Sequence, residues 1–445
     1  MTGEPVASLG FASRMGIIAA ATFAVWAACG FWNSVKPLPA GLHVTSLPAR
    51  LTDAQVDFID DSQQRGALLE RELDMIDRAE QAVVVDECPL TSRMFEHLLM
   101  RKRQRPNVRI LLVTDPRDEV YGGTAANILG SLEQAGIVVA RAHLDRMRDS
   151  NPLYSSLWRL GMGWWSAPFD ETPGVVTLTS TLRRLNNKAD ERQLLVADDG
   201  AGGWTSLVMS APPLANPLVD TDLGLLIRGN LARDIVASEL GIAAWSTDDD
   251  RLPTVPPVGA HGVGSIDARF LTEGALATAL HEVINLTASG DSVSLMARAL
   301  NDRATLEALA RAASRGVHLQ LLLDPDVPGT QSAAAELIHE GAGDIGIRWQ
   351  AGADRREARY ALVRHRNDVW IEVGSANLTR RDLSDFNLTA SVELHMPERS
   401  PQARAAVDLF ARAWSSAAPY ASHADASREN YWRYRLEEAT GSGLF

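Results

Sequence analysis

The chain has 445 residues, of which 46% are hydrophobic and 6% aromatic, and these values are typical of a globular protein with a large core. Its 56 acidic residues outnumber its 43 basic residues, so the formal net charge is −13. An acidic body repels the phosphates of nucleic acids and of anionic lipids, so we expect no nucleic-acid partner and no electrostatic docking on a membrane.

An uncharged apolar run, residues 15–32, follows an N-terminal tail of residues 1–14. Crossing a bilayer takes roughly 20 such residues, and the run is longer than the core of a cleaved signal peptide, about 7–15 residues. We therefore expect a signal anchor, with a cleaved signal peptide and lipidation at Cys29 as the alternatives. Neither Cys29 nor Cys88 has a Cys or His partner at metal-ligand spacing, so we expect no metal and no cofactor.

Strands and helices alternate after a linker at residues 33–52. The pattern predicts a helix over 67–82, a strand over 83–86, a second helix over 92–103 and a strand over 108–113. Alternation of this kind is typical of an α/β fold with a mostly parallel sheet and helices on both faces.

The same order recurs in the second part of the chain. Gly66-Ala67-Leu68 and Gly274-Ala275-Leu276 each open a predicted helix, and the strand from Val108 to Pro116 has a counterpart from Val317 to Pro325. Between the copies lies a stretch rich in Asp, Pro and Gly, which is typical of a linker. We therefore expect two pseudo-symmetric halves, residues 53–247 and 265–445, joined by residues 248–264.

Residues 143–173 interrupt the first half with an aromatic and glycine-rich insertion that includes Trp158, Trp164 and Trp165. We expect this insertion to pack on the core, and a position at a membrane interface is the alternative. At the other end of the chain, an amphipathic helix over 403–416 precedes a tail, residues 431–445, that we expect to pack back on the body.

A small-residue turn stands out in the second half. The apolar strand 369–373 runs directly into Gly374-Ser375-Ala376-Asn377-Leu378-Thr379-Arg380-Arg381. The turn places a hydroxyl from Ser375 and an amide from Asn377 at a strand end, where α/β domains usually bind ligands.

With this turn, the chain resembles a bacterial member of the phospholipase D superfamily. Four further stretches carry the resemblance: residues 120–123, residues 149–159, Lys188-Ala189 upstream of 194–199, and the tail from Tyr434 to Gly441. The resemblance implies a duplicated fold with a His-x-Lys-x4-Asp motif in each half. One histidine attacks phosphorus, the other protonates the leaving alcohol, and lysines, serines and asparagines hold the phosphate.

This chain departs from that motif in both halves. The first copy falls on Glu191, Gln193 and Asp198, and the second falls on Glu357, Arg359 and Arg364. The turn of the first half is eroded as well, because Met209-Ser210-Ala211-Pro212 replaces its Gly and Asn. The chain has only three lysines, of which Lys188 alone is near a motif. The candidate phosphate-binding residues are therefore Lys188, Ser210, Ser375 and Asn377, while His365 breaks the motif spacing and is expected in a loop.

Replacing imidazoles and ammonium groups by carboxylates turns attraction for a phosphate into repulsion, by about 4 kcal/mol per close pair of charges at an effective dielectric near 20. We therefore expect a catalytically degenerate, membrane-anchored protein that binds a phospholipid or another phosphate-containing ligand, or acts as a scaffold. It would lie in a bacterial inner membrane with a periplasmic body.

Two alternatives remain. One is an active hydrolase, or a cardiolipin synthase-like transferase, in which Glu191 or Glu357 is the nucleophile or acid and Arg359 binds the phosphate. The other is different chemistry between two facing carboxylates, such as glycosidic acid/base catalysis or binding of a cationic head group or metal.

Overall fold

The computed structural model describes residues 11–39, 42, 47–116, 126–162, 188–212, 223–247, 264–327, 329–340, 342–350, 359–420 and 432. Several predicted features lie outside these ranges. They are Glu357, residues 120–123, residues 163–173 of the insertion, the linker 248–264 except Gly264, and the tail 431–445 except Trp432.

Among its described residues, the first half contains seven strands and four helices apart from its insertion. In chain order they are β1 (Leu51–Asp60), α2 (Ala67–Arg78), β2 (Ala82–Asp86), α3 (Ser92–Gln104), β3 (Arg109–Thr114), α5 (Ala126–Gln134), β4 (Val138–Arg141), β5 (Leu194–Asp198), β6 (Trp204–Met209), β7 (Leu223–Arg228) and α9 (Leu231–Ser246).

The second half repeats this order and adds a short helix and a short last strand. Its elements are β8 (Ile266–Thr272), α10 (Gly274–Leu286), β9 (Ser292–Ala297), α11 (Arg303–Ser314), β10 (His318–Leu323), α12 (Thr330–Glu340), β11 (Ile345–Trp349), β12 (Tyr360–His365), β13 (Asp368–Gly374), α13 (Arg380–Leu383), β14 (Ala390–Pro397), α14 (Pro401–Ser416) and β15 (Ala418–Pro419).

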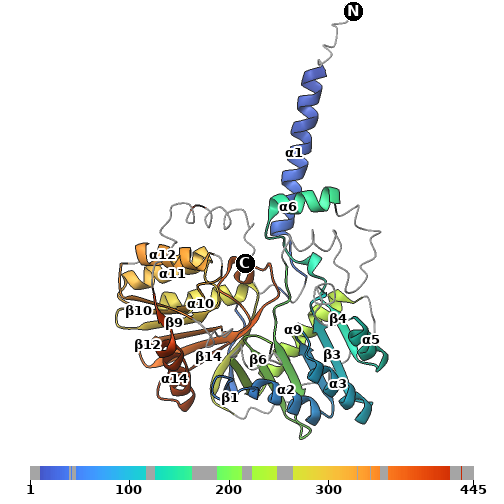
Figure 1. Cartoon of the computed structure of the whole chain (residues 1–445), viewed down its shortest axis with the longest axis vertical. Coiled ribbons are helices and arrows are strands. Elements are labelled where there is room, and N and C mark those ends of the chain that lie inside the picture. Colours follow the sequence, from blue (N-terminus) through green and yellow to red (C-terminus); the bar gives the residue numbers. More distant parts are fainter. Residues whose placement is uncertain are drawn as a thin grey trace, which may run out of the picture.

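All strands join one sheet whose order is nearly a palindrome. The order is β15-β11-β10-β9-β12-β13-β14-β8-β1-β7-β6-β5-β2-β3-β4, so β8 and β1 pair at the centre and each half continues outward in the same sequence of strands. Figure 1 shows the two halves side by side. The prediction of an α/β fold with two pseudo-symmetric halves is therefore confirmed.

The prediction of mostly parallel strands is wrong in detail. Only the outer strands are parallel, namely β2-β3-β4 in the first half and β9-β10-β11 in the second. The strands nearer the centre are antiparallel, because short connections such as residues 199–203 and 366–367 turn the chain straight back into hairpins. Tight connections permit only antiparallel pairing, whereas a parallel pair needs a long crossover.

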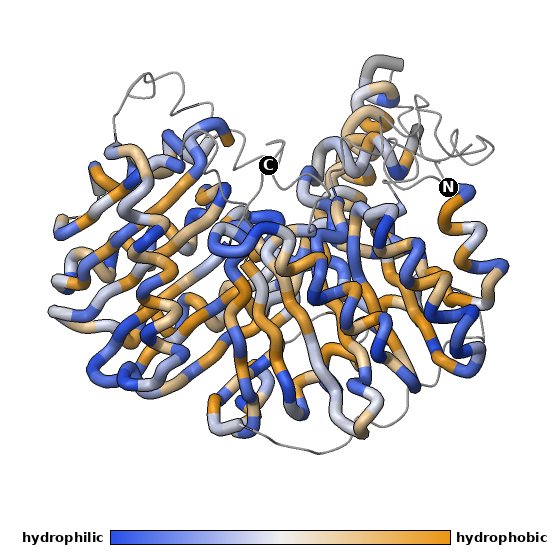
Figure 2. Tube along the Cα trace, turned by 60° about the horizontal axis from the view of Figure 1, so that its bottom comes forward, coloured by the Kyte–Doolittle hydropathy of each residue, from blue (hydrophilic) through white to orange (hydrophobic). Residues whose placement is uncertain are grey.

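One hydrophobic core runs through the junction of the halves. Val208 and Ile227 of the first half belong to the same buried cluster as Val373 and Val392 of the second. Separate clusters lie under α2 and α3 in the first half and under α10 and α11 in the second. Figure 2 shows apolar residues running along the strands of both halves. Because the central core is shared, the halves cannot separate without exposing it to water.

An apolar helix, α1 (Phe11–Val35), projects from the body (Figure 1), as the sequence predicts. Residues Ser13–Val35 are long and apolar enough to cross a membrane, by length and composition. We call residues 31–36, at the C-terminal end of α1, the foot of α1. The described part of the predicted insertion lies against this foot. It contains the short turn η1 (Leu144–Arg146), the helix α6 (Pro152–Leu157) and the π-helical turn η2 (Trp158–Met162).

Candidate functional site at the junction of the two halves

The two degenerate motifs occupy equivalent places in the fold. Gln193 directly precedes β5, and Arg359 directly precedes β12. Each lies opposite the end of the next strand: the carbonyl of Gln193 accepts from the amide of Met209 at the end of β6, while Tyr360, next to Arg359, pairs with Val373 near the end of β13. Gln193 and Arg359, which the resemblance aligns with each other, thus occupy equivalent positions in the two halves.

Arg359 crosses the junction between the halves. Its Nη1 donates to the carbonyl oxygen of Ser210 in the first half at 2.9 Å, and also to the carbonyl oxygen of Ser375. Its Nε donates to Oδ1 of Asn377 at 3.0 Å. The structure therefore brings together four of the predicted site residues: Ser210, Arg359, Ser375 and Asn377.

The two serines hold the backbone in matching ways. The hydroxyl of Ser210 accepts from the amide of Leu223 at 3.1 Å, and the hydroxyl of Ser375 accepts from the amide of Ala390 at 3.2 Å. Both side chains are fully buried. Each serine therefore ties the end of one strand to the start of the next, so its hydroxyl serves the fold.

The loss of the glycine in the first turn has a structural counterpart. Met209, in place of glycine, pairs with Gly224, whereas Gly374 of the second turn pairs with Ser391. A Cβ at Gly224 would lie 2.4 Å from Leu68 Cδ2, and a Cβ at Gly374 would lie 2.2 Å from the carbonyl oxygen of Ala390. Both halves therefore have a glycine where a Cβ would clash, but in the first half it is on the other strand and makes room for side chains instead of backbone.

The carboxyl group of Asp382 balances the charge of Arg359, and the sequence analysis missed it. Asp382 is buried and accepts hydrogen bonds from the amide of Asn377 at 2.9 Å and from Nδ2 of Asn387 at 2.6 Å. Burial raises the pKa of Asp382, although the charge of Arg359 opposes that shift. The only feature of the sequence that could have indicated Asp382 is its position directly after the predicted turn.

Asn387 continues the connection into the first half. Its Oδ1 accepts from the amide of Ala189 at 3.0 Å, and the amide of Glu191 donates to the carbonyl of Leu388 at 2.9 Å. Segment 189–191 thus runs along segment 387–388 of the other half. Glu191 is half-buried here, beside segment 387–388 of the other half.

Gln193 offers a neutral amide where the resemblance implies a lysine. Its Nε2 donates to the carbonyl of Cys88 at 3.0 Å, within its own half. The neighbouring Glu87 is fully buried, and burial raises the pKa of its carboxyl group to about 8. A lysine at 193 would add a positive charge beside this acid, whereas glutamine adds none.

Three other predicted residues do not reach the junction. Asp198 lies at the far end of β5, about 15 Å along the strand from Gln193, and accepts from the backbone amides of residues 80–82 and 200. Arg364 pairs with Glu398 on the surface at 2.8 Å. Lys188 is buried and pairs with Asp149 at 2.5 Å.

His365, expected in a loop, is the last residue of β12 and contacts Asp291 at 2.6 Å.

The residues on either side of Glu191 in the sequence belong to a buried ion network. Arg192 is fully buried and donates to Glu239 and to Glu273, each at 2.6 Å, and Glu273 belongs to the second half. Burial raises the pKa of Asp190 well above its ordinary value, with Glu239 adding to the shift and Arg192 opposing it. Among its described residues, the junction therefore holds more carboxyl groups than cations.

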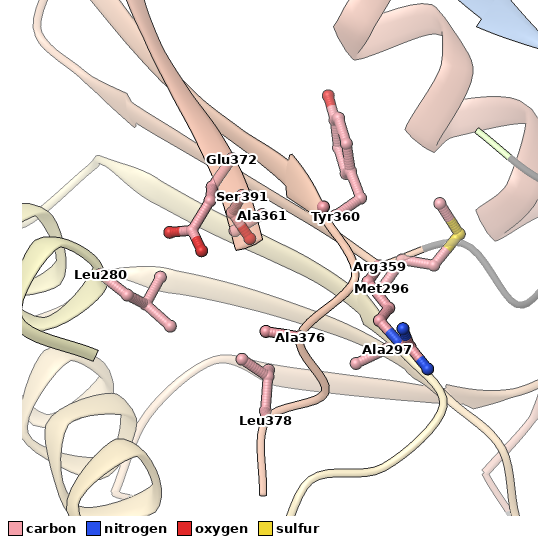
Figure 3. A pocket seen from close by; sticks show the side chains of 11 residues that line it. Leu280, Met296, Ala297, Arg359, Tyr360, Ala361, Glu372, Ala376, Leu378 and Ser391 are labelled. Carbon is pink, nitrogen blue, oxygen red and sulfur yellow. The ribbon is translucent and has the colours of Figure 1, made fainter. Parts of the chain in front are cut away.

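The cavity beside Arg359 is small. It measures about 20 Å³ and is lined by residues of β9, β12, β13 and the turn (Figure 3). Glu372 and Ser391 point into it, while Tyr360 points to the opposite face of the sheet. Burial raises the pKa of Glu372 to about 8, and the nearby Glu393 adds to this. The described residues thus leave room for about one water molecule beside Arg359.

No group of three or more His, Cys, Asp and Glu residues within the described ranges is placed to hold a metal ion.

Comparisons with known proteins agree with this fold. The family model described as "Cardiolipin synthase, PLD-like domain" matches residues 283–414, which include Arg359, Ser375 and Asn377. No curated protein matches the sequence significantly.

Two solved structures resemble the whole body. Phosphatidylserine synthase from Haemophilus influenzae has a TM-score of 0.60 at 10% identity, over 89% of this chain and 96% of that one. Polyphosphate kinase from Porphyromonas gingivalis has a TM-score of 0.52 at 12% identity, over 87% of this chain and 53% of that one, so this chain spans about half of the kinase. Residues 283–414 therefore match a phospholipase D-like domain, and the body as a whole shares the fold of phosphatidylserine synthase.

Proposed function

We propose that this protein is a membrane-anchored, catalytically inactive relative of phospholipase D-type enzymes that binds phospholipid head groups or scaffolds other proteins at the membrane. The body is on the periplasmic side of a bacterial inner membrane, and α1 is its anchor. The resemblance to a cardiolipin synthase-like domain and the apolar α1 support a phospholipid as the ligand class.

The observation that carries the proposal is the use made of Arg359. It is the one cation at the described motif positions of the junction, and its guanidinium donates to three oxygens of the protein. Asp382 balances its charge. A residue that would grip a phosphate in an active relative here holds the two halves together.

The histidine and the lysine that catalysis would need are absent from the described first motif, which has Glu191 and Gln193 in their places. Glu191 cannot supply a neutral imidazole, and as a carboxylate it repels a phosphodiester. Attack by a carboxylate on phosphorus is known chemistry, but the anionic transition state then needs positive charge. Among the described residues of the junction, the guanidiniums of Arg359 and Arg192 are already bound to oxygens of the protein. Each 1.36 kcal/mol of lost transition-state stabilisation lowers the rate about tenfold.

The test is turnover by the purified full-length chain on vesicles of phosphatidylglycerol. We expect neither phosphatidic acid nor cardiolipin above the level without protein, while an active family member with both histidines serves as positive control. Turnover comparable with that control, lost in Glu191→Gln, would replace this proposal by an enzyme with a rewired site. Turnover unaffected by Glu191→Gln would overturn it as well.

Head-group binding is measured separately by flotation of the chain lacking residues 1–35 with vesicles of phosphatidylglycerol or of phosphatidylcholine. Recovery with the vesicles identifies a binding role and the preferred head group. No recovery with either lipid leaves the scaffold as the function. Circular dichroism establishes that the shortened chain is folded before the result is read.

A further inference from the structure

Exposed apolar side chains surround the foot of α1. Phe31 and Trp32 of α1 are 68% and 61% exposed, and Leu157 and Leu160 of α6 and η2 are 52% and 48% exposed. Trp158 of the same segment is buried, so the segment has one face on the body and one face outward. Large apolar side chains gathered on a surface mark a contact with a partner or a membrane.

The segment from α6 to η2, residues 152–162, packs against α1 and lies across it in Figure 1. A helix that crosses a bilayer runs roughly along the membrane normal. A segment that lies across the foot of such a helix runs along the membrane surface. Helices with one apolar face adopt this position at the boundary between head groups and acyl chains.

The foot of α1 is hydrogen-bonded to residues 145–149, which directly precede this segment. The carbonyl of Asn33 accepts from the amide of Asp149 at 2.9 Å, and the carbonyl of Lys36 accepts from Nε of Arg148 at 2.9 Å. Nζ of Lys36 donates to the carbonyl of Asp145 at 3.1 Å. These bonds hold α1 at a defined position on the body, unlike a helix joined by a free linker.

A buried ion cluster supports the same segment from below. Asp149 is fully buried and accepts from Arg159 at 2.6 and 2.9 Å and pairs with Lys188 at 2.5 Å. Burial alone would raise the pKa of Asp149, but the hydrogen bond from Arg159 and the charges of Lys188 and Arg159 outweigh it, so the pKa is lowered. Arg159 is thus turned inward, which leaves the outward face of η2 to Leu160.

We propose that residues 152–162 lie in the head-group boundary of the bilayer that α1 crosses, with Leu157 and Leu160 inserted among the lipids. The occupant of this apolar face is the lipid of that same membrane, because the face is continuous with the exposed side chains at the foot of α1. The inference rests on the proposed function in taking α1 as a membrane anchor. It favours the interfacial alternative for the described part of the insertion.

The same contacts connect the membrane surface to the junction. Nη1 of Arg148, which holds the foot of α1, pairs with Asp385 at 2.8 Å, three residues from Asp382. Lys188, which pairs with Asp149, is three residues from Glu191. Two chains of contacts therefore connect the foot of α1 to the junction, one through each half.

The test uses the full chain with Cys29→Ser and Cys88→Ser, reconstituted into vesicles of phosphatidylethanolamine and phosphatidylglycerol. A single cysteine is introduced by Leu160→Cys and labelled with an environment-sensitive fluorophore. Met100→Cys is the matched control, because Met100 is also 48% exposed and belongs to α3, a helix that Figure 1 shows away from α1. Phe23→Cys in α1 reports separately whether the anchor enters the bilayer.

We expect the label at 160 to be quenched by spin-labelled lipids about twofold or more above the label at 100, and its emission to shift to the blue. The label at 23 is quenched as well. If the label at 23 is quenched and the label at 160 behaves like that at 100, the surface position is wrong while the anchor stands. If the label at 23 stays in water, the anchor fails, and with it both the membrane part of the proposed function and this inference.

Discussion

Arg192 of the first half and Glu273 of the second form a salt bridge of 2.6 Å in which both side chains are fully buried. The backbone of Glu273 has a φ of 44°, which residues other than glycine rarely adopt. The bridge thus holds an unfavourable backbone conformation at the junction of the halves.

Arg192→Gln should be strongly destabilising. The substitution leaves the carboxyl groups of Glu239 and Glu273 buried without their cation, and breaking such a pair lowers the free energy of unfolding by about 3–5 kcal/mol. Arg228→Gln, which breaks an exposed pair with Asp57, should lower it by less than about 1 kcal/mol. Urea denaturation of the chain lacking residues 1–35 measures both, and equal effects of the two substitutions would contradict the role assigned to Arg192.

Glu87→Gln should change how stability depends on pH. Burial raises the pKa of Glu87 to about 8, whereas an unfolded glutamate titrates near 4.5. Between these values the folded state binds more protons than the unfolded state, so stability falls as the pH rises from about 5 to 8. In Glu87→Gln this fall should be smaller, and at pH 8 the variant should be more stable than the parent.

Thermal melts at pH 5 and pH 8 measure this effect. Glu80→Gln is the control, because Glu80 lies on the surface of the same half. Some fall should remain in Glu87→Gln, since burial also raises the pKa of Glu72, and Glu87 contributes to that shift. A melting temperature of Glu87→Gln that drops between the two pH values as much as that of the parent would show that Glu87 does not titrate in this range.

Gly374→Ala should separate β13 from β14. A Cβ at this position would lie 2.2 Å from the carbonyl oxygen of Ala390 and 2.4 Å from Cα of Ser391, and backbone atoms cannot yield cheaply. We expect a loss of about 1–3 kcal/mol in the free energy of unfolding. Gly241→Ala in α9 is the control: its Cβ meets nothing within 4 Å, and alanine favours a helix by up to about 1 kcal/mol. A neutral Gly374→Ala would mean that the strands are further apart than described.

Much of the fold could be predicted from the sequence, because local patterns determine it. The helix predicted over 92–103 is α3, Ser92–Gln104, and the strand predicted over 369–373 is β13, Asp368–Gly374. The recurrence of Gly66 directly before α2 and of Gly274 at the start of α10 indicated the two halves. Each of these signals lies within one short stretch of chain.

The central pair of strands was not predicted. β1, Leu51–Asp60, contains four acidic or amide residues in ten, and only two of its side chains are fully buried. Its place in the sheet is set by pairing with β7 and β8 from distant parts of the chain. Propensity and burial pattern say little about such a strand, since its stability comes from its neighbours.

The sequence predicted those residues of the site that belong to the motifs or to their turns. Ser210, Arg359, Ser375 and Asn377 meet because they occupy equivalent strand ends in the two halves. The partners that neutralise them, Asp382 for Arg359 and the carboxyl groups around Arg192, depend on contacts across the junction. No spacing in the sequence announces such contacts.

The role of Arg359 can be separated into geometry and charge by two substitutions. Arg359→Lys keeps the positive charge beside Asp382 but loses the planar fork that reaches Ser210, Ser375 and Asn377 together. We expect it to lower the free energy of unfolding by about 1–3 kcal/mol, the range for buried groups left without partners. Arg359→Gln also leaves the carboxyl group of Asp382 uncompensated, so its loss should be larger, about 3–5 kcal/mol.

Urea denaturation of both variants, together with flotation on phosphatidylglycerol vesicles, decides between a structural and a ligand-binding arginine. If Arg359 joins the halves, stability falls in the order parent, Arg359→Lys, Arg359→Gln. If instead it grips a phosphate, both variants keep the parent stability and lose flotation. In that case the three oxygens around the guanidinium would only position it for a ligand, and the inactive, scaffold-like reading of the junction would have to be given up.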